Sequence, residues 1–515
     1  PEPRPETPGK RPGIVVAYFR GRLRHCLFSN DWSKARVPDK FIGRLPLIYY
    51  KIDLILPRKH YKTIMNFERK AYRRLLEWKN NPNRKPLIIR GARQVGKSTL
   101  VNQFSNEFSH FISLNMEKKT HHRFFEGLQD VRQITEAVFL STNTPKDDGP
   151  VLLFIDEIQD SPRAIQMLRY FYEERPDIFV VAAGSLLEFA LREVPSFPVG
   201  RVEQMVLHPF DFEEFLMAMG HTAALEALNH IPVEPYAHDT LLELFHTYAA
   251  IGGMPEIVRQ YLTEQSMANL PHTYESLWQG YKDDVIKYAR NPTERKVMQH
   301  VIYTAPQEKD RVAFEGFGYS NYKSREVGEA LRSLDQARVL QLIYPSSSTR
   351  PPLETDFKKR PRLQFLDTGL LNHAMQLQAD MIGLEDLNAL YKGRTVQHLV
   401  TQELMAQHDT PSYKPHFWVR ENANSQAEVD LMHVHKQYVL PIEVKSGESG
   451  TLRSLHQYME VCNHPYAIRL LANRFSVSQV QTATGTSFLL MNLPYYLGTK
   501  IPDYAAYFTS NYSLK

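Results

Sequence analysis

A glycine-rich segment early in the 515-residue chain has the residue types needed to bind a phosphate chain. It reads Gly91-Ala-Arg-Gln-Val-Gly96-Lys97-Ser98, with two glycines separated by four residues and followed by lysine and serine. Glycine adopts backbone conformations closed to other residues, so consecutive N–H groups can surround a phosphate. The lysine can reach the outer phosphates, and the serine hydroxyl can hold Mg²⁺. The pattern predicts binding of a phosphate chain with Mg²⁺ through Gly91, Gln94, Val95, Gly96, Lys97, Ser98 and Thr99.

The flanking residues favour this interpretation over a chance glycine-rich turn. An apolar run at residues 87–89 precedes the loop, and Leu100-Val101 begins a helical pattern after it. This strand, loop and helix would place the positive end of the helix at the phosphates.

Two acids follow a second apolar run, at residues 151–155. Asp156 can bind Mg²⁺ through water, and Glu157 can polarise the water that attacks the phosphate. Acids are also common where helices begin. The upstream loop favours the catalytic interpretation, with Glu157 as the base.

Two further residues are candidates for contact with the γ-phosphate. Ser185 follows an apolar run at residues 178–183 and could bond the phosphate or the water, or could instead cap a helix. Arg201 follows Gly200 and could reach the γ-phosphate from the same or a neighbouring subunit, or could be a surface arginine in a turn.

A second group of chemically capable residues lies near the C-terminus. The alternation in Glu428-Val-Asp430 and Glu443-Val-Lys445 puts each pair on one face of a strand. A hairpin would join these faces, so that Asp430 and Glu443 could bind a divalent cation and Lys445 could activate a water. An exposed sheet face with paired Glu and Lys would give the same pattern.

The elements around these residues predict an α/β fold. Apolar strands alternate with helical patterns up to about residue 207, as expected for a mainly parallel sheet whose carboxyl edge binds ligands. Helical patterns follow at 213–229, 241–250 and 256–305, and then a helix at 324–337 and a strand at 339–344 suggest a winged-helix unit. We expect a basic extension at 1–64, an ATPase core at 65–215, a helical and winged-helix region at 216–345, and a C-terminal α/β domain at 346–515.

The charge of the chain is concentrated at its beginning. Residues 1–64 contain 14 Lys/Arg and 5 Asp/Glu, a charge of +9, so the remainder carries +5 − 9 = −4. This segment is either a nucleic-acid-binding arm or, as we expect, an extension ahead of a start at Met65. Two cysteines fit a reducing, cytoplasmic setting, and no apolar stretch approaches the ~20 residues of a membrane span.

Several of these motifs resemble a family of prokaryotic AAA-type ATPases that carry a C-terminal region called domain of unknown function 4143. The resemblance covers about residues 65–500. It rests on the segments Arg90–Thr99, Phe154-Ile-Asp-Glu-Ile-Gln159, Ala183-Gly-Ser185, Gly200-Arg201, His208-Pro-Phe-Asp-Phe-Glu-Glu-Phe215, Gly252-Gly-Met-Pro-Glu256, Leu366-Asp-Thr-Gly-Leu370, Glu428-Val-Asp430 and Ile442-Glu-Val-Lys-Ser446.

The resemblance implies a P-loop fold of the additional-strand, catalytic-Glu type. It implies Asp156 as the Mg²⁺ acid, Glu157 as the base and Ser185 as the sensor. The C-terminal part is similar to restriction-endonuclease-like folds, with Asp430, Glu443 and Lys445 in the metal-binding signature. Family members often carry a Glu where this chain has Gln397, and this departure weakens the case for a nuclease. Glu403, farther along the same helix, is a possible further acid or a residue of a solvated helix face.

The leading hypothesis is a Mg²⁺-dependent ATPase whose hydrolysis drives a conformational switch, with DNA as the expected partner and a homo-oligomer as one possible state. The alternatives are an ATP-regulated, metal-dependent DNA nuclease and a nucleotide-gated signalling module with little turnover.

Overall fold

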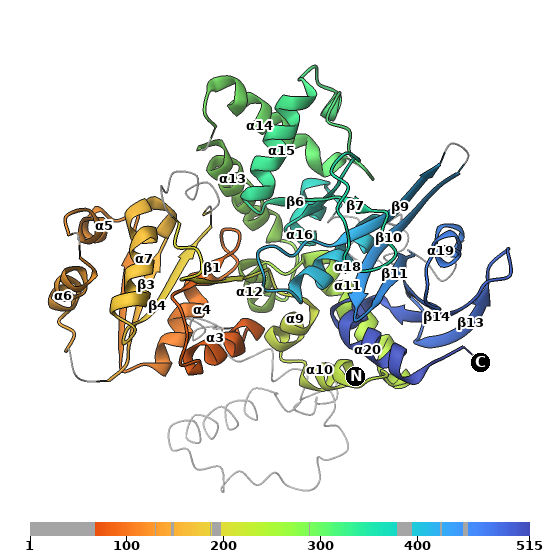
Figure 1. Cartoon of the computed structure of the whole chain (residues 1–515), viewed down its shortest axis with the longest axis horizontal. Helices are drawn as coiled ribbons and strands as arrows, with labels where there is room; N and C mark the ends of the chain where they lie inside the picture. Colours follow the sequence, from red (N-terminus) through yellow and green to blue (C-terminus); the bar gives the residue numbers. More distant parts are fainter. Residues whose placement is uncertain are drawn as a thin grey trace, which may run out of the picture. The chain divides into compact units, whose positions relative to one another are not determined.

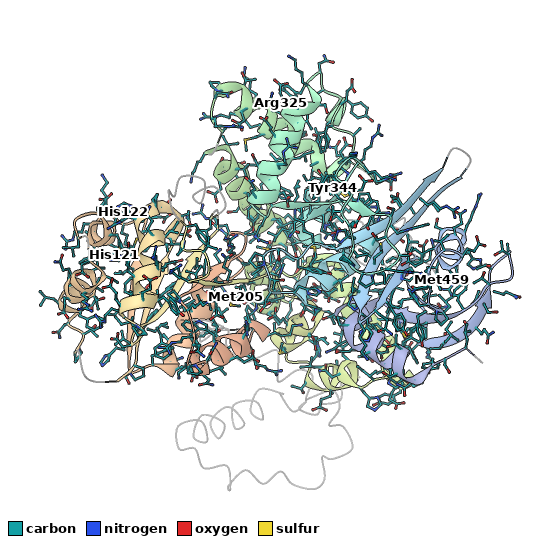
Figure 2. All side chains as sticks on the ribbon, in the orientation of Figure 1. His121, His122, Met205, Arg325, Tyr344 and Met459 are labelled. Carbon is teal, nitrogen blue, oxygen red and sulfur yellow. The ribbon has the colours of Figure 1, made fainter. Side chains whose placement is uncertain are left out.

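The computed structural model describes residues 67–128, 130–145, 149–185, 187, 197–287, 289–308, 310–377, 394–422, 425–445 and 452–514. The extension predicted at 1–64 lies outside these residues. Figure 1 shows the order of the elements along the chain, and Figure 2 adds the side chains.

The first sheet is parallel throughout and has the strand order β2-β3-β4-β1-β5. Its strands are β1 (Leu87–Arg90), β2 (His110–Asn115), β3 (Val151–Asp156), β4 (Phe179–Gly184) and β5 (Glu203–Val206). This confirms the predicted α/β architecture of a P-loop sheet.

Helices cover both faces of this sheet because side chains alternate along each strand. In β1, Leu87 and Ile89 belong to one buried cluster with residues of α3 (Lys70–Asn80) and α4 (Lys97–Phe104). Ile88 belongs to a second cluster with the helices on the other face, which are α5 (Lys119–Glu126), α6 (Val131–Thr142) and α7 (Pro162–Glu174). The near-continuous apolar strands are typical of a sheet that is buried on both sides.

A helical region follows the sheet, and two of its predicted helical patterns, 213–229 and 256–305, are divided into shorter helices. The pattern at 213–229 is divided by Gly220, which has φ 72° and ends the first helix in the left-handed conformation that glycine favours. The helices are α9 (Phe212–Met219), α10 (Thr222–Asn229), α11 (His238–Ile251), α12 (Pro255–Glu264), α13 (Leu270–Lys287), α14 (Pro292–Thr304) and α15 (Ser324–Gln336).

A two-stranded antiparallel hairpin follows α15. It pairs β6 (Leu340–Ile343) with β8 (Arg362–Phe365), and the boundary predicted at 345/346 falls in the segment between them. That segment includes β7 (Pro345–Ser346), which pairs with a strand of the second sheet. Helices α16 (Thr368–Ala374) and α18 (Arg394–Ala406) lie between the hairpin and that sheet in the sequence.

The second sheet is mixed and has the order β13-β14-β12-β11-β10-β9-β7. The antiparallel pair β10 and β11 confirms the predicted hairpin, with His435 opposite Tyr438 and Leu431 opposite Ile442. The remaining elements are β9 (His416–Asn422), β10 (Ser425–His435), β11 (Tyr438–Val444), α19 (Arg453–Met459), β12 (Tyr466–Leu471), β13 (Ser476–Gln481), β14 (Ser487–Pro494) and α20 (Ile501–Asn511). The sequence analysis did not predict β13, β14 and α20.

A buried aspartate fixes the turn that leads into α12. Asp367 is fully buried and accepts hydrogen bonds from the backbone N–H of Gly253 (2.6 Å) and of Leu370 (3.0 Å). Burial raises the pKa of Asp367 to about 6. A Cβ at Gly252, which has φ 69°, would lie 2.3 Å from this carboxylate. The turn therefore depends on an acid more than 100 residues away in the sequence.

In the part of the chain that the structure describes, no helix is long and apolar enough to cross a membrane.

We predict that Asp367→Ala destabilises the protein by about 2–4 kcal/mol, because two buried N–H groups would lose their acceptor. Urea denaturation followed by circular dichroism would measure the effect. Asp130→Ala is the matched control, because Asp130 is an exposed cap that accepts one bond, from Arg132 N; its loss should cost about 1 kcal/mol. Equal effects of the two substitutions would contradict the role given to Asp367.

Candidate functional site

The glycine-rich loop lies directly after β1, at the carboxyl edge of the first sheet. Gly91 has φ 151°, and a Cβ there would lie 2.4 Å from the carbonyl oxygen of Leu207. Gly96 has φ 96° and precedes the first turn of α4. Both glycines are therefore required by the backbone path, and the loop N–H groups stand at the positive end of a helix.

Lys97 is buried within the loop. Its Nζ donates to the carbonyl oxygens of Gly91 (3.0 Å) and Ala92 (2.8 Å). Burial is the largest influence on its pKa, which is lowered to about 8. An ammonium held in this way is close to the backbone that would surround a phosphate.

Ser98 and Asp156 meet across the loop, although 58 residues separate them in the sequence. The Ser98 hydroxyl donates to Oδ2 of Asp156 at 2.8 Å, and Oδ1 accepts from the backbone N–H of Glu157 at 3.1 Å. Burial raises the pKa of Asp156. A hydroxyl and a carboxylate oxygen at this spacing are ligands that suit Mg²⁺, which takes its other ligands from phosphates and water. Among the described residues, no group of three or more His, Cys, Asp or Glu side chains could hold a metal ion by itself.

Glu157 lies at the mouth of the same site in an unusual backbone conformation. Its φ of 50° is in the left-handed region, which is uncommon for residues other than glycine. Its Oε2 accepts a hydrogen bond of 2.7 Å from the side-chain amide of Gln159. The side chain of Gln159 in turn packs against Gly184 at the end of β4. The Glu157 carboxylate is therefore held by the Gln159 side chain, which packs against the end of the neighbouring strand, β4.

A pocket of about 310 Å³ joins Lys97, Ser98 and Glu157 to groups that the sequence analysis did not identify. Three arginines line it: Arg69, Arg93 and Arg259. Arg93 lies inside the glycine-rich motif, and this position in the sequence could have identified it as a pocket residue. Arg69 and Arg259 are distant in the sequence and have no local signal of this kind.

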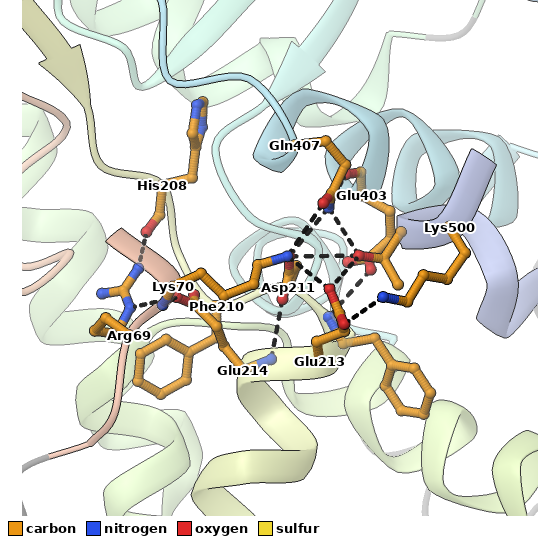
Figure 3. A network of polar contacts seen from close by, with 12 residues as sticks. Arg69, Lys70, His208, Phe210, Asp211, Glu213, Glu214, Glu403, Gln407 and Lys500 are labelled. Atoms are coloured by element: carbon orange, nitrogen blue, oxygen red, sulfur yellow. Dashed lines mark hydrogen bonds and ion pairs between the residues drawn. The ribbon is translucent and has the colours of Figure 1, made fainter. Parts of the chain in front are cut away.

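The three arginines differ in their partners. Arg69 donates to the carbonyl oxygen of Val95 in the loop at 2.9 Å. It also forms an ion pair of 3.0 Å with Glu214 of α9, and Figure 3 shows these two residues. Arg93 pairs with Asp284 of α13. The Nε of Arg259 is buried without a hydrogen-bond partner among the described residues.

Ser185 lies beside the loop, and Arg201 does not. Ser185 is buried just after β4, whose last residue Gly184 is opposite Arg90 of β1. Arg201 precedes β5 and so lies at the amino edge of the sheet, where it pairs with Glu173 of α7. Within one chain, the structure does not bring Arg201 together with Lys97.

The second predicted group is also brought together, on β10 and β11. Lys445 Nζ lies 2.5 Å from Oε1 of Glu443, and Asp430 accepts a bond of 2.9 Å from the backbone N–H of Val444. The other oxygen of Glu443 is buried without a partner among the described residues. Burial raises the pKa of Glu443 to about 7, and the nearby charge of Asp430 adds to this.

An arginine occupies the space next to these acids. Arg362 forms ion pairs with Glu428 and with Asp430 (3.5 Å), and its Nη1 donates to the Asp430 carbonyl oxygen. Gln397 lines the same small pocket as Asp430 and Arg362. This group therefore has a fixed cation beside Asp430, and the amide of Gln397 lies close by.

Glu403 belongs to neither site, and both earlier interpretations of it are wrong. It is fully buried, and its carboxylate accepts bonds from the backbone N–H of Phe212 (3.0 Å) and from the Tyr248 hydroxyl (2.6 Å). Burial raises its pKa to about 8. It therefore connects α18 to α9 and α11.

Comparisons with known proteins agree with the sheet and its loop. Residues 83–216 match the sequence profile of an AAA domain, residues 242–381 a domain of unknown function (DUF8612), and residues 392–495 another domain of unknown function (DUF4143). No curated protein matches the chain significantly.

The solved structures that match this chain share little sequence with it. A Walker-type ATPase of Pyrococcus abyssi is 14% identical, with a TM-score of 0.39 over 60% of this chain and 96% of its own. PCH-2 of C. elegans is 15% identical, with a TM-score of 0.23 over 39% and 59%. The ORC1 protein of Aeropyrum pernix in complex with DNA is 14% identical, with a TM-score of 0.27 over 59% and 91%.

The profile matches and the parallel sheet with its glycine-rich loop together show that the chain contains an AAA-type P-loop ATPase domain, followed by two domains of unknown function.

Proposed function

We propose that this protein hydrolyses ATP with Mg²⁺ and that hydrolysis drives a conformational switch. The observation that carries the proposal is the convergence of Lys97, Ser98, Asp156 and Glu157 at the carboxyl edge of one parallel sheet. Ligands bind at this edge in open α/β sheets. Phosphoryl transfer needs positioned positive charge, a metal site and a base, and this group supplies all three.

In this mechanism the loop N–H groups and Lys97 hold the phosphate chain. Ser98 and Asp156 would hold Mg²⁺, which would neutralise charge on the phosphate chain. Glu157 orients a water and accepts one of its protons. The water oxygen bonds to the γ-phosphorus, the bond from that phosphorus to the bridging oxygen breaks, and ADP leaves with the electron pair. Ser185 bonds the γ-phosphate or the water.

The switch is supported by contacts from the nucleotide pocket to the helical region. Arg69 binds the loop carbonyl of Val95 and the α9 carboxylate of Glu214, while Arg93 pairs with α13. A change in the loop would therefore act directly on two helices outside the sheet. Arg201 could act only from a neighbouring copy in a homo-oligomer, because it lies at the opposite edge of its own sheet.

DNA is the partner we propose. Helices α14 and α15 with the β6–β8 hairpin have the element order of a winged helix, and exposed basic residues lie along this part of the chain: Lys323, Arg325, Arg332, Arg350, Lys358 and Arg360. We keep the divisions at 1–64, 65–215, 216–345 and 346–515 as working domains. For the last of these we propose a restriction-endonuclease-like fold, because β10 carries Asp430, β11 carries Glu443 and Lys445 follows β11 directly, as that signature requires.

A metal-dependent nuclease is the second candidate, favoured by the buried Glu443 oxygen beside Lys445 that has no hydrogen-bond partner among the described residues. Arg362 argues against it, since its guanidinium occupies the cation position next to Asp430. We therefore propose that this domain binds DNA without cutting it.

We predict that Lys97→Ala reduces kcat/KM for ATP on the order of 10³-fold, because the phosphates lose a buried charge. Phosphate release assays with Mg²⁺ would measure this. Lys79→Ala is the control: Lys79 lies on α3 and donates to the Glu107 carbonyl outside the pocket, so its turnover should match wild type. Normal turnover in Lys97→Ala would refute the ATPase proposal.

We predict that Glu157→Gln still binds ATP but lowers kcat about 10²–10⁴-fold, because the amide cannot accept the proton of the water. Titration with a fluorescent ATP analogue and single-turnover hydrolysis would separate binding from chemistry. If the substitution weakens binding and leaves kcat unchanged, Glu157 is not the base.

We predict no cleavage of plasmid or single-stranded DNA by wild type with Mg²⁺ or Mn²⁺, with or without ATP, in a preparation that hydrolyses ATP. Gel electrophoresis beside Lys445→Ala would test this. Cleavage that disappears in Lys445→Ala would establish the nuclease and assign metal roles to Asp430 and Glu443.

A further inference from the structure

We propose that Arg93 of the glycine-rich loop contacts the γ-phosphate of ATP, and that Asp284 of α13 competes with this phosphate for the guanidinium. The inference rests on the proposed ATPase function. It adds a phosphate-contacting residue whose contact with the helical region differs between ATP and ADP.

Arg93 is placed where the γ-phosphate is expected. It lies in the loop between Gly91 and Lys97, and it lines the nucleotide pocket together with Lys97 and Glu157. The base that acts on the γ-phosphate and an arginine that neutralises it must both be close to that phosphate. Arg93 therefore meets the positional requirement that Arg201, at the other edge of the sheet, does not meet within the chain.

The other pocket arginines are less suited to this role. Arg69 is engaged by Glu214, by the Val95 carbonyl and by the His208 carbonyl, and so serves to hold the loop. The guanidinium of Arg259 lies 5.9 Å from the centre of the Phe67 ring, on the side of the pocket formed by α12 and residue 67. The pKa of Arg93 is raised, chiefly by its hydrogen bond with Asp284 and further by the nearby charge of Glu157.

Helix α13 holds Arg93 by both its backbone and its side chain. The buried hydroxyl of Tyr281 donates to the Arg93 carbonyl oxygen at 2.7 Å. The Nη1 of Arg93 lies 2.6 and 2.7 Å from the two carboxylate oxygens of Asp284. Both short contacts use one nitrogen, and a guanidinium has five N–H donors, so the group can bind a second acceptor or change partner.

The two members of this pair differ in exposure, which makes exchange feasible. The Arg93 side chain is 41% exposed, whereas Asp284 is 7% exposed. A phosphate can therefore approach the arginine from the pocket, while Asp284 stays in place. A second cation remains for Asp284, because Lys287 Nζ lies 3.2 Å from its Oδ1. A buried charge without a partner is costly. Loss of Arg93 avoids this cost, because Asp284 would still be paired with Lys287.

ATP and ADP should then have different effects on α13. The γ-phosphate draws Arg93 away from Asp284 and loosens the hold on the helix, whereas ADP leaves the pair intact. After hydrolysis and loss of phosphate, the pair forms again. This gives the proposed switch a specific contact that distinguishes the two nucleotides.

Two substitutions that break the same ion pair should have opposite effects. Arg93→Ala should lower kcat on the order of 10³-fold, as for other arginines that stabilise the transferred phosphoryl group, and should reduce the ratio of ATP to ADP affinity about tenfold. Asp284→Asn frees the arginine and should raise that ratio several-fold without lowering kcat. Calorimetric titration with each nucleotide and phosphate release assays would measure both quantities.

The design separates a nucleotide contact from a structural one. If the pair only stabilises the fold, both substitutions will lower the melting temperature and shift the affinity ratio in the same direction, and the proposal is overturned. Arg93→Lys should recover part of the ATP preference, because it restores the charge without the planar fork. Arg290→Ala, which removes an exposed pair with Glu294, should leave both quantities at wild-type values.

Failure of this inference can be distinguished from failure of the ATPase proposal. Wild type that hydrolyses ATP while Arg93→Ala retains full kcat and ATP preference would overturn only the role of Arg93. Wild type that prefers ATP through Arg93 but does not hydrolyse it would overturn the ATPase proposal and support the contact. Wild type that binds ATP and ADP equally would overturn the contact.

Discussion

The structure depends on keeping the buried carboxylates in the first turn of α9 paired. Asp211, Glu213 and Glu214 are all buried, and their cations come from both ends of the described chain. Arg69 and Lys70 lie at the start of α3, and Lys500 lies directly before α20 (Figure 3). A buried charge without a partner costs several kcal/mol. The flank that precedes the P-loop sheet and the C-terminal segment must therefore be in place before α9 can be buried.

The same constraint explains why the nucleotide pocket is connected to distant parts of the chain. Arg69 binds the loop at Val95 and α9 at Glu214, so the phosphate loop and the buried charges share one guanidinium. Asp367 performs a similar task for the turn before α12, whose residues Pro255 and Arg259 line the pocket. The phosphate loop supplies the chemistry, and residues far away in the sequence hold its surroundings.

The sequence predicts the features that depend on local patterns. The five strands of the first sheet, the glycine-rich loop and the β10–β11 hairpin follow from apolar runs and alternation. Features that depend on tertiary contacts could not be predicted in this way. The Arg93–Asp284 pair joins residues 191 positions apart, and Arg362 reaches Asp430 from another sheet. Glu403 has the spacing of a helix-surface acid, but the helices packed around it leave it buried.

The burial of Glu403 bears on how this protein could have been assembled from parts. Sequence profiles divide the chain into three segments, as though each were an interchangeable module. Yet α18, in the third segment, supplies the carboxylate that binds the backbone of Phe212 in the first segment and the hydroxyl of Tyr248 in the second. If one segment were exchanged with that of a relative, the contacts of Glu403 with Phe212 and Tyr248 could lose one of their members. The three segments are therefore expected to be inherited together, as one cooperative unit.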